Sequence, residues 1–134
     1  MSIFSSVKTM RRLLDTCIVY DWMMDKLTHK PTIQLIEQSG AFVSAVSVWE
    51  MAIKHGIGKM DLPSRAIVDD ITAQGFRWLN ITPYHTQAVL ELPTYHKDPF
   101  DRLLIAQATC EDLRIITYDD LFGRYLTDTL VVRH

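Results

Sequence analysis

Four carboxylates far apart in the sequence, Asp15, Glu50, Asp101 and Asp119, are the residues best placed to do chemistry. Asp15 ends a short apolar run and Asp119 follows a stretch rich in β-branched residues, so both are predicted to lie at the ends of strands. Asp101 shares a helix face with apolar residues three, four and seven positions later, where an uncompensated charge is costly. If these carboxylates gather, they cannot all stay ionised without a counter-charge.

A divalent cation is the counter-charge that suits such a cluster, because Mg²⁺ and Mn²⁺ prefer hard oxygen ligands. A cation held in this way can bind a phosphate oxygen and lower the pKa of a bound water, which is the equipment for phosphodiester hydrolysis. The residues therefore predict Asp15, Asp101 and Asp119 as metal ligands. Glu50 is predicted either to ligate the metal or to orient the attacking water.

Each of these carboxylates also has a structural interpretation. Glu50 follows Ser47 by three residues, as in a capping box, unless the helix begins at Ser44 and places Glu50 one turn deeper. Asp101 follows Asp98 by three residues and could merely favour the positive end of a helix. Asp98 itself is assigned to N-capping, with a lesser possibility that it helps to hold the metal.

The same question applies to the last of the four acids. Asp119 could be a turn residue, with Asp120 capping a short helix that follows. Asp15, inside an apolar run, is the hardest of the set to explain as scaffold.

The composition is that of one globular domain. The 134 residues suffice for a substantial core, and 48% hydrophobic with 22% charged residues is close to the globular average. No apolar run approaches the roughly 20 residues of a membrane span, and no signal peptide is evident, so we expect a cytoplasmic protein that avoids the membrane. Cys17 and Cys110 are then expected to be free thiols. Residues 1–9 are predicted to be a loose leader before a domain of residues 10–134.

Short apolar strands alternate with helices along the chain. Strands are predicted near residues 13–16, 41–44, 76–81, 113–117 and 130–132, and helices near 18–27, 31–38, 46–57, 66–74, 82–90 and after Asp98. This order predicts a parallel sheet covered by helices on both faces. Ligands bind such sheets beyond the carboxyl ends of the strands, where the strand order reverses, so the four acids can meet at one pole.

Four sequence blocks resemble the PIN domains of VapC-type toxins. They are LLDT at 13–16, SAVSVWEMAIK at 44–54, HKDPFDRLLIAQA at 96–108 and ITYD at 116–119. The resemblance runs from about Met10 to the C-terminus. It implies a three-layer α/β/α sandwich with a mostly parallel sheet of four to five strands. It also implies a Mg²⁺- or Mn²⁺-dependent endoribonuclease, a homodimer, and a cognate VapB-type antitoxin that blocks the site.

The resemblance carries over residue by residue. The acidic residues of the family fall on the four carboxylates already singled out, Asp15, Glu50, Asp101 and Asp119, and its supporting hydroxyl falls on Thr117. Cys17 departs from the family, because many relatives have histidine there. Its position beside the predicted site suggests that it could respond to oxidation.

An RNA substrate needs positive charge beside the acidic pocket, since the net charge of the chain is −2. The candidates are Arg11, Arg12, Lys54, Lys59, Lys97 and Arg102. Lys54 and Lys97 are favoured because they neighbour the predicted ligands in sequence. Tyr95 and Tyr118 are candidates for stacking with unpaired bases, whereas Trp49 is as readily a core residue. The histidines His55, His85 and His96 show no metal-ligand spacing and are interpreted as surface or core polar residues.

Two other functions remain open from the residues alone. Asp15 could be the nucleophile of a phosphatase, but the second aspartate expected at position 17 is Cys17. The chain could also be a non-catalytic interaction module, and cleavage of DNA rather than RNA is chemically possible. Apolar residues of the early helices are candidates for dimer or antitoxin contacts, with core packing as the alternative: Trp22, Met23, Leu27, Ile33 and Leu35.

Overall fold

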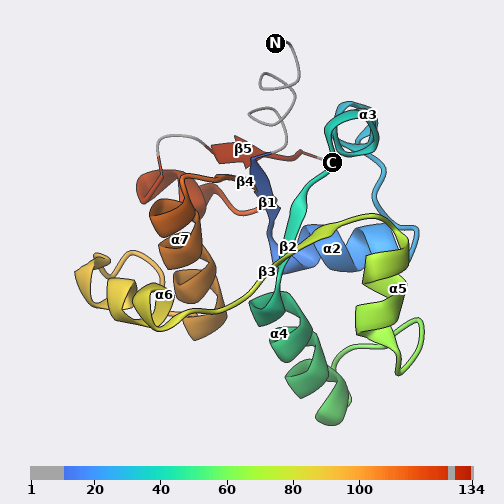
Figure 1. The fold of residues 1–134 in the computed structure, drawn as a ribbon, viewed down its shortest axis with the longest axis horizontal. Helices are drawn as coiled ribbons and strands as arrows, with labels where there is room; N and C mark the ends of the chain where they lie inside the picture. Colours follow the sequence, from blue (N-terminus) through green and yellow to red (C-terminus); the bar gives the residue numbers. More distant parts are fainter. Residues whose placement is uncertain (1–10, 127–128, 134) are drawn as a thin grey trace.

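Five short strands form an all-parallel sheet in the order β3-β2-β1-β4-β5 (Figure 1). The strands are β1 (Arg12–Leu14), β2 (Phe42–Ser44), β3 (Arg77–Leu79), β4 (Arg114–Thr117) and β5 (Thr129–Val131). The computed structural model describes residues 11–126 and 129–133, so the leader predicted for residues 1–9 lies outside the described residues. The predicted parallel sheet is confirmed, with all five strands parallel.

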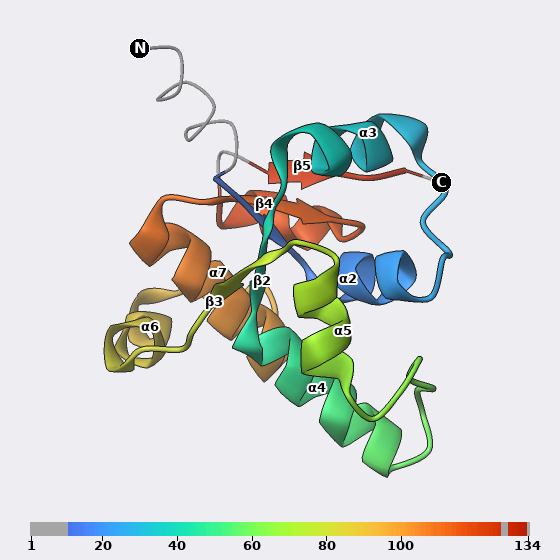
Figure 2. The ribbon, with the colours of Figure 1, turned by 45° about the vertical axis from the view of Figure 1, so that its right-hand side comes forward.

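Helices cover both faces of this sheet, as Figures 1 and 2 show. They are α2 (Thr16–Met23), α3 (Lys30–Ser39), α4 (Ala45–Gly56), α5 (Ile67–Ala73), α6 (Pro83–Ala88) and α7 (Pro99–Glu111), with 3-10 turns η1 (Val89–Glu91) and η2 (Asp120–Arg124). Helices α2, α3 and α5 lie on one side and α6 and α7 on the other. The architecture is therefore the predicted α/β/α sandwich. Within the described ranges, no helix is both long and apolar enough to cross a membrane.

Two apolar clusters hold these layers together, and the alternation of strand side chains divides residues between them. Leu14 of β1 and Ile116 of β4 belong to the cluster beneath α2, α3 and α5. Leu13 and Ile115, one position earlier on the same strands, belong to the cluster beneath α7. All four side chains are completely buried. The central strands are thus apolar on both faces, which is why their sequence shows continuous rather than alternating hydrophobicity.

The helix α7 begins where the sequence predicts. The side chain of Asp98 accepts a hydrogen bond from the Asp101 backbone N–H at 3.0 Å, and Pro99 takes the first helical position. The N-capping role predicted for Asp98 is thereby confirmed. The helix then carries an unbroken buried stretch from Leu103 to Ala108, because it is covered by the sheet and also by α4 and α6.

The strand order reverses beside β1, because β2 pairs with one edge of β1 and β4 with the other. Ligands of parallel sheets bind at this kind of reversal, outside the carboxyl ends of the strands. Asp15 follows the last residue of β1, and Asp119 follows β4 by two residues. The topology therefore brings these two carboxylates to neighbouring positions at one pole of the sheet.

Candidate functional site

Asp15 lies at the end of β1 and is buried, with 6% of its surface exposed. Its Oδ1 accepts a hydrogen bond from the Thr16 N–H and its Oδ2 accepts one from the Thr117 hydroxyl, both at 2.7 Å. Burial raises the pKa of Asp15 to about 6, even though these two hydrogen bonds lower it. The charged form of Asp15 is therefore stabilised only in part by the protein.

Thr117, predicted as a supporting hydroxyl, connects the two strand-end carboxylates. Its Oγ1 donates to Asp15 Oδ2 and accepts from the backbone N–H of Asp119 at 3.0 Å. The side chain is completely buried at the end of β4. This single hydroxyl therefore fixes the position of Asp119 relative to Asp15.

Glu50 lies in the second turn of α4, because that helix begins after Ser44, whose hydroxyl caps it. The capping-box alternative is therefore wrong, and Ser47 instead exchanges a hydrogen bond with the Thr16 hydroxyl at 2.9 Å. Glu50 is buried, and its Oε2 accepts from Lys54 Nζ at 2.6 Å. Its other oxygen, Oε1, is buried and finds no hydrogen-bond partner among the described residues. A buried acceptor in this condition is costly unless something binds it.

Among the carboxylates of the described residues, Asp101 has the pKa that is raised furthest above its ordinary value. Its pKa is raised to about 8, first by burial and then by the negative charges of Asp15, Asp98, Glu50 and Asp119. All three other sequence-predicted acids thus act on Asp101, although residues 15, 50, 101 and 119 come from four different parts of the chain. The four carboxylates therefore lie near enough for their charges to act on one another, which supports the prediction that they form one acidic pocket.

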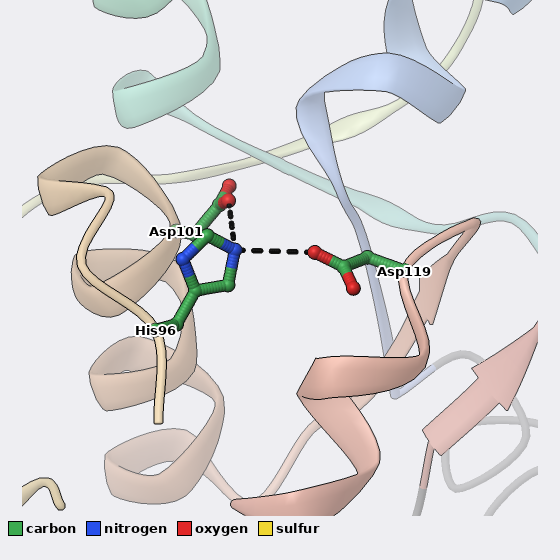
Figure 3. Close-up of side chains that lie close together, drawn as sticks. All are labelled: His96, Asp101 and Asp119. Atoms are coloured by element: carbon green, nitrogen blue, oxygen red, sulfur yellow. Dashed lines mark hydrogen bonds and ion pairs between the residues drawn. The ribbon is translucent and has the colours of Figure 1, made fainter. Parts of the chain in front are cut away.

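His96 lies between two of these carboxylates (Figure 3). Its Nε2 is 2.8 Å from Asp101 Oδ2 and 3.1 Å from Asp119 Oδ2. One ligand atom from each of the three residues lies within 4.8 Å of the others. The interpretation of His96 as an ordinary polar residue was therefore wrong. The other two histidines fit that interpretation: His85 is buried and completes the capping box of α6 with Thr82, and His55 contacts the Met60 carbonyl.

Asp119 takes the capping role that the sequence had suggested for its neighbour. The Oδ1 of Asp119 accepts from the Leu121 N–H at 2.9 Å, so Asp119 caps η2. Asp120 instead forms an exposed ion pair with Arg133. Capping and site formation are not exclusive, because Asp119 caps with Oδ1 and meets His96 with Oδ2.

Comparisons with known proteins decide the family. The PIN domain model matches residues 12–125, which is most of the chain. The chain belongs to the PIN domain family. No curated protein matches it.

Solved structures support the same fold. A chain of the DNA-bound VapBC of Salmonella typhimurium superposes with a TM-score of 0.64 at 18% identity, covering 92% of this PIN domain and 97% of that chain. The DNA-bound VapBC2 of Rickettsia felis gives 0.60 at 18%, covering 91% and 96%. FitAcB of Neisseria gonorrhoeae gives 0.59 at 15%, with the same coverage. At these identities the likeness establishes the fold.

The acidic pocket of this PIN domain fits a divalent cation. It offers several carboxylate oxygens, which are the ligands that Mg²⁺ and Mn²⁺ prefer. Glu50 Oε1 has no partner among the described residues, and burial first of all raises the pKa values of Asp15 and Asp101, so the ionised forms of these acids are poorly compensated within the chain. A cation would relieve these costs together. Asp15, Glu50, Asp101 and Asp119 are the residues that would hold it.

The basic residues predicted to contact RNA differ in their exposure and in the contacts that their side chains already make within the PIN domain. Lys97 is exposed, and Lys54 is partly exposed and paired with Glu50. The guanidinium of Arg102 donates to backbone carbonyls of the loop before α7, among them Pro93 at 2.8 Å and His96 at 3.2 Å. Arg102 therefore holds that loop, and we do not carry it forward as an RNA contact.

The exposed aromatic residues also differ from expectation. Trp49, which the sequence could as readily place in the core, is 49% exposed and stacks edge-on against Phe100 with ring centroids 4.7 Å apart. Each ring neighbours a site carboxylate in sequence. The Tyr118 hydroxyl donates to Asp21, and the Tyr95 ring lies under Arg124. Trp49 is therefore a better candidate for stacking with a base than either tyrosine.

Cys17 is predicted to resist oxidation and alkylation. Cys17 is exposed at the surface, but burial of its sulfur by the groups around it, reinforced by the negative charges of Asp15 and Glu50, raises the pKa of the thiol to about 12, and the thiolate is the reactive form. At pH 8 iodoacetamide should modify Cys110 well before Cys17, as peptide mass spectrometry would show. Faster modification of Cys17 would contradict the electrostatic picture of the pocket and revive the idea of an oxidation-sensitive residue.

Proposed function

We propose that this PIN domain is a metal-dependent endoribonuclease whose site is the pocket formed by Asp15, Glu50, Asp101 and Asp119. The observation that carries the proposal is the mutual effect of these carboxylates at the switch point of the sheet. The pKa of Asp101 rises to about 8, first through burial and then through the negative charges of neighbours that include the other three acids, so a positive ion would stabilise its charged form. PIN domains are generally nucleases, which agrees with this chemistry.

A bound Mg²⁺ or Mn²⁺ supplies polarisation of the phosphate and a more acidic water, which is what phosphodiester hydrolysis requires. Within the chain, Asp15 and Asp119 are held at a fixed spacing by Thr117. The partnerless Glu50 Oε1 is available either as a ligand or to accept a hydrogen bond from the attacking water. Lys54 neutralises the opposite oxygen of Glu50 and keeps that side chain in place. Asp98 acts on the site through its charge and through the cap of α7.

The proposed substrate is single-stranded RNA, with unstacked bases resting on Trp49 beside the pocket. Aromatic stacking of bases is the usual way in which single strands are held, and exposed Lys97 adds attraction for the phosphates. Trp49 directly precedes Glu50 in the sequence, and Lys97 precedes Asp101 by four residues.

Replacing Trp49 by alanine should weaken RNA binding without changing the affinity for Mn²⁺. Stacking contributes about 1–3 kcal/mol per base, so the Kd for a single-stranded RNA should rise about 5- to 150-fold. Fluorescence anisotropy with a labelled RNA measures this effect. Tyr84→Ala, which removes an aromatic ring that is 77% exposed on α6, is the matched control and should bind as wild type does. Equal effects of the two substitutions would remove Trp49 from the proposal.

We further propose that the chain acts as the toxin of a toxin–antitoxin pair and is inhibited by a cognate VapB-type antitoxin. The support is the shared fold with chains of VapBC complexes and the resemblance of the four sequence blocks. The early-helix residues suggested for partner contacts, such as Trp22 and Ile33, instead pack against the core. Exposed apolar surface lies around Trp49, where a groove of about 620 Å³ runs beside Val68 and Trp78. The homodimer and the cytoplasmic location stay predictions.

Cleavage of total cellular RNA by the purified chain tests this function. We expect fragments to appear with added Mg²⁺ or Mn²⁺ and to disappear with EDTA, and we expect single-stranded DNA of matched sequence to be spared. Absence of cleavage under every metal condition would favour the non-catalytic alternative. Metal-dependent cleavage of DNA but not RNA would keep the site and overturn the substrate.

A further inference from the structure

We propose that His96 is a positioning residue, whose Nε2–H donates to Asp119 and contacts Asp101 at 2.8 Å and so sets the spacing of the two carboxylates, and that its ring does not ligate the cation. The part of this inference that concerns the cation rests on the proposed function. The part that concerns the ring stands on the contacts of His96 within the chain.

The other ring nitrogen of His96 decides where the proton lies. Nδ1 accepts a hydrogen bond from the Asp98 backbone N–H at 3.2 Å. A backbone N–H can only donate, so Nδ1 must present its lone pair and the ring proton must be on Nε2. Nε2 then faces Asp101 Oδ2 and Asp119 Oδ2 as a donor (Figure 3).

Ligation of a cation by His96 would conflict with this arrangement. To offer a lone pair from Nε2, the ring would have to move its proton to Nδ1, and two N–H groups would then face each other across 3.2 Å. The contact with Asp98 would be lost at the residue that caps α7. The proximity of His96 to two carboxylates therefore indicates a donor between two ligands, as is common for groups that orient metal-bound side chains.

The loop around His96 is built to hold the ring in this orientation. The backbone N–H of His96 donates to the Tyr125 hydroxyl at 2.6 Å, and its carbonyl accepts from Arg102 Nη1 at 3.2 Å. The Tyr125 hydroxyl in turn donates to the Pro93 carbonyl at 2.9 Å. The imidazole is only 16% exposed and packs edge-on against Phe122. Both backbone groups and both ring nitrogens of His96 thus have assigned partners.

The consequence for the site is a fixed pair of carboxylates. Asp119 is held through Oδ1 by the Leu121 N–H and through Oδ2 by His96, so its orientation is set from both sides. Asp101 is held by His96 through Oδ2 alone. The His96 ring therefore connects α7, which carries Asp101, with the turn after β4, which carries Asp119.

Long-range ¹H–¹⁵N NMR of the histidine rings tests the assignment directly on the wild-type chain. We expect His96 to carry its proton on Nε2 and not on Nδ1, both in the metal-free protein and with saturating Mg²⁺. A proton on Nδ1, in either condition, would overturn the proposal. This readout does not depend on RNA cleavage, so it separates failure of the inference from failure of the proposed nuclease function.

Two substitutions test the positioning role. His96→Gln keeps a donor near the Nε2 position, whereas His96→Leu keeps similar bulk without one. We expect Mn²⁺ affinity, measured by titration calorimetry, to fall about 10- to 100-fold in the leucine variant and to stay close to wild type in the glutamine variant. Pulsed EPR of bound Mn²⁺ should show no coupling to a directly bound histidine nitrogen. Unchanged affinity in His96→Leu, or a nitrogen coupling that vanishes in His96→Gln, would contradict the inference.

Discussion

Replacing Asp101 by asparagine is expected to abolish RNA cleavage while leaving the fold intact. The asparagine side chain keeps the shape of aspartate, but it removes one negative charge from the group of carboxylates proposed to hold the cation. A metal ion contributes several kcal/mol of stabilisation to the transition state, and each 1.36 kcal/mol is tenfold in rate, so we expect a loss of about 1,000-fold or more. The hydrogen bond from His96 Nε2–H to Asp119 is untouched by this substitution.

The measurement is the rate of RNA cleavage at saturating Mn²⁺, with circular dichroism to verify the fold. Asp69→Asn is the matched control, because it neutralises an exposed carboxylate on α5 outside the pocket. It should cleave RNA at the wild-type rate. Wild-type activity in Asp101→Asn would show that the pocket is not the site of cleavage.

Without metal, the protein should lose stability as the pH rises, and a divalent cation should restore it. The folded-state pKa of Asp101 is about 8 and that of Asp15 about 6, both above their ordinary value of 3.8. The folded state therefore holds these protons more tightly than the unfolded state does. Their contribution is complete below about pH 4 and is lost progressively as the pH rises through 6 and then 8. Each such group lowers the free energy of unfolding by at most about 1.4 kcal/mol per pH unit in its window.

Thermal unfolding between pH 5 and pH 9, with EDTA or with Mn²⁺, measures this dependence. We expect the decline of the melting temperature with pH to be shallower in Asp101→Asn, because the amide needs no proton to stay neutral. That variant should approach wild type only toward pH 4, should already be the more stable protein near pH 6, and should exceed wild type by the largest margin near pH 9 in EDTA. Stability that rises with pH by the same amount in both proteins would show that the carboxylates do not repel one another.

Local signals in the sequence predicted the elements well. Asp98 followed by Pro99 marks the start of α7 because a cap and a fixed backbone angle act within one helical turn. The continuous apolar runs at Leu13-Leu14 and Ile115-Ile116 indicated strands buried on both faces. The alternation of such strands with helices then favoured a parallel sheet, and the switch point of that sheet placed Asp15 and Asp119 together.

Contacts that depend on the folded backbone were harder to predict. His96 has no periodicity or ligand spacing, and only the loop held by Arg102 and Tyr125 turns its ring toward Asp101. Residue type alone cannot separate a basic side chain that holds a loop, such as Arg102, from one that faces RNA. The exposure of Trp49 likewise follows from where α4 leaves the sheet, which its own sequence does not determine.

Crystals of the wild-type chain soaked in Mn²⁺ would test the central claim most directly, through the anomalous scattering of the metal. The account predicts a Mn²⁺ peak within bonding distance of oxygens from Asp15, Asp101 and Asp119, with Glu50 bound directly or through water. A Mn²⁺ peak elsewhere on the molecule, with these four carboxylates left without an ion at saturating metal, would contradict it.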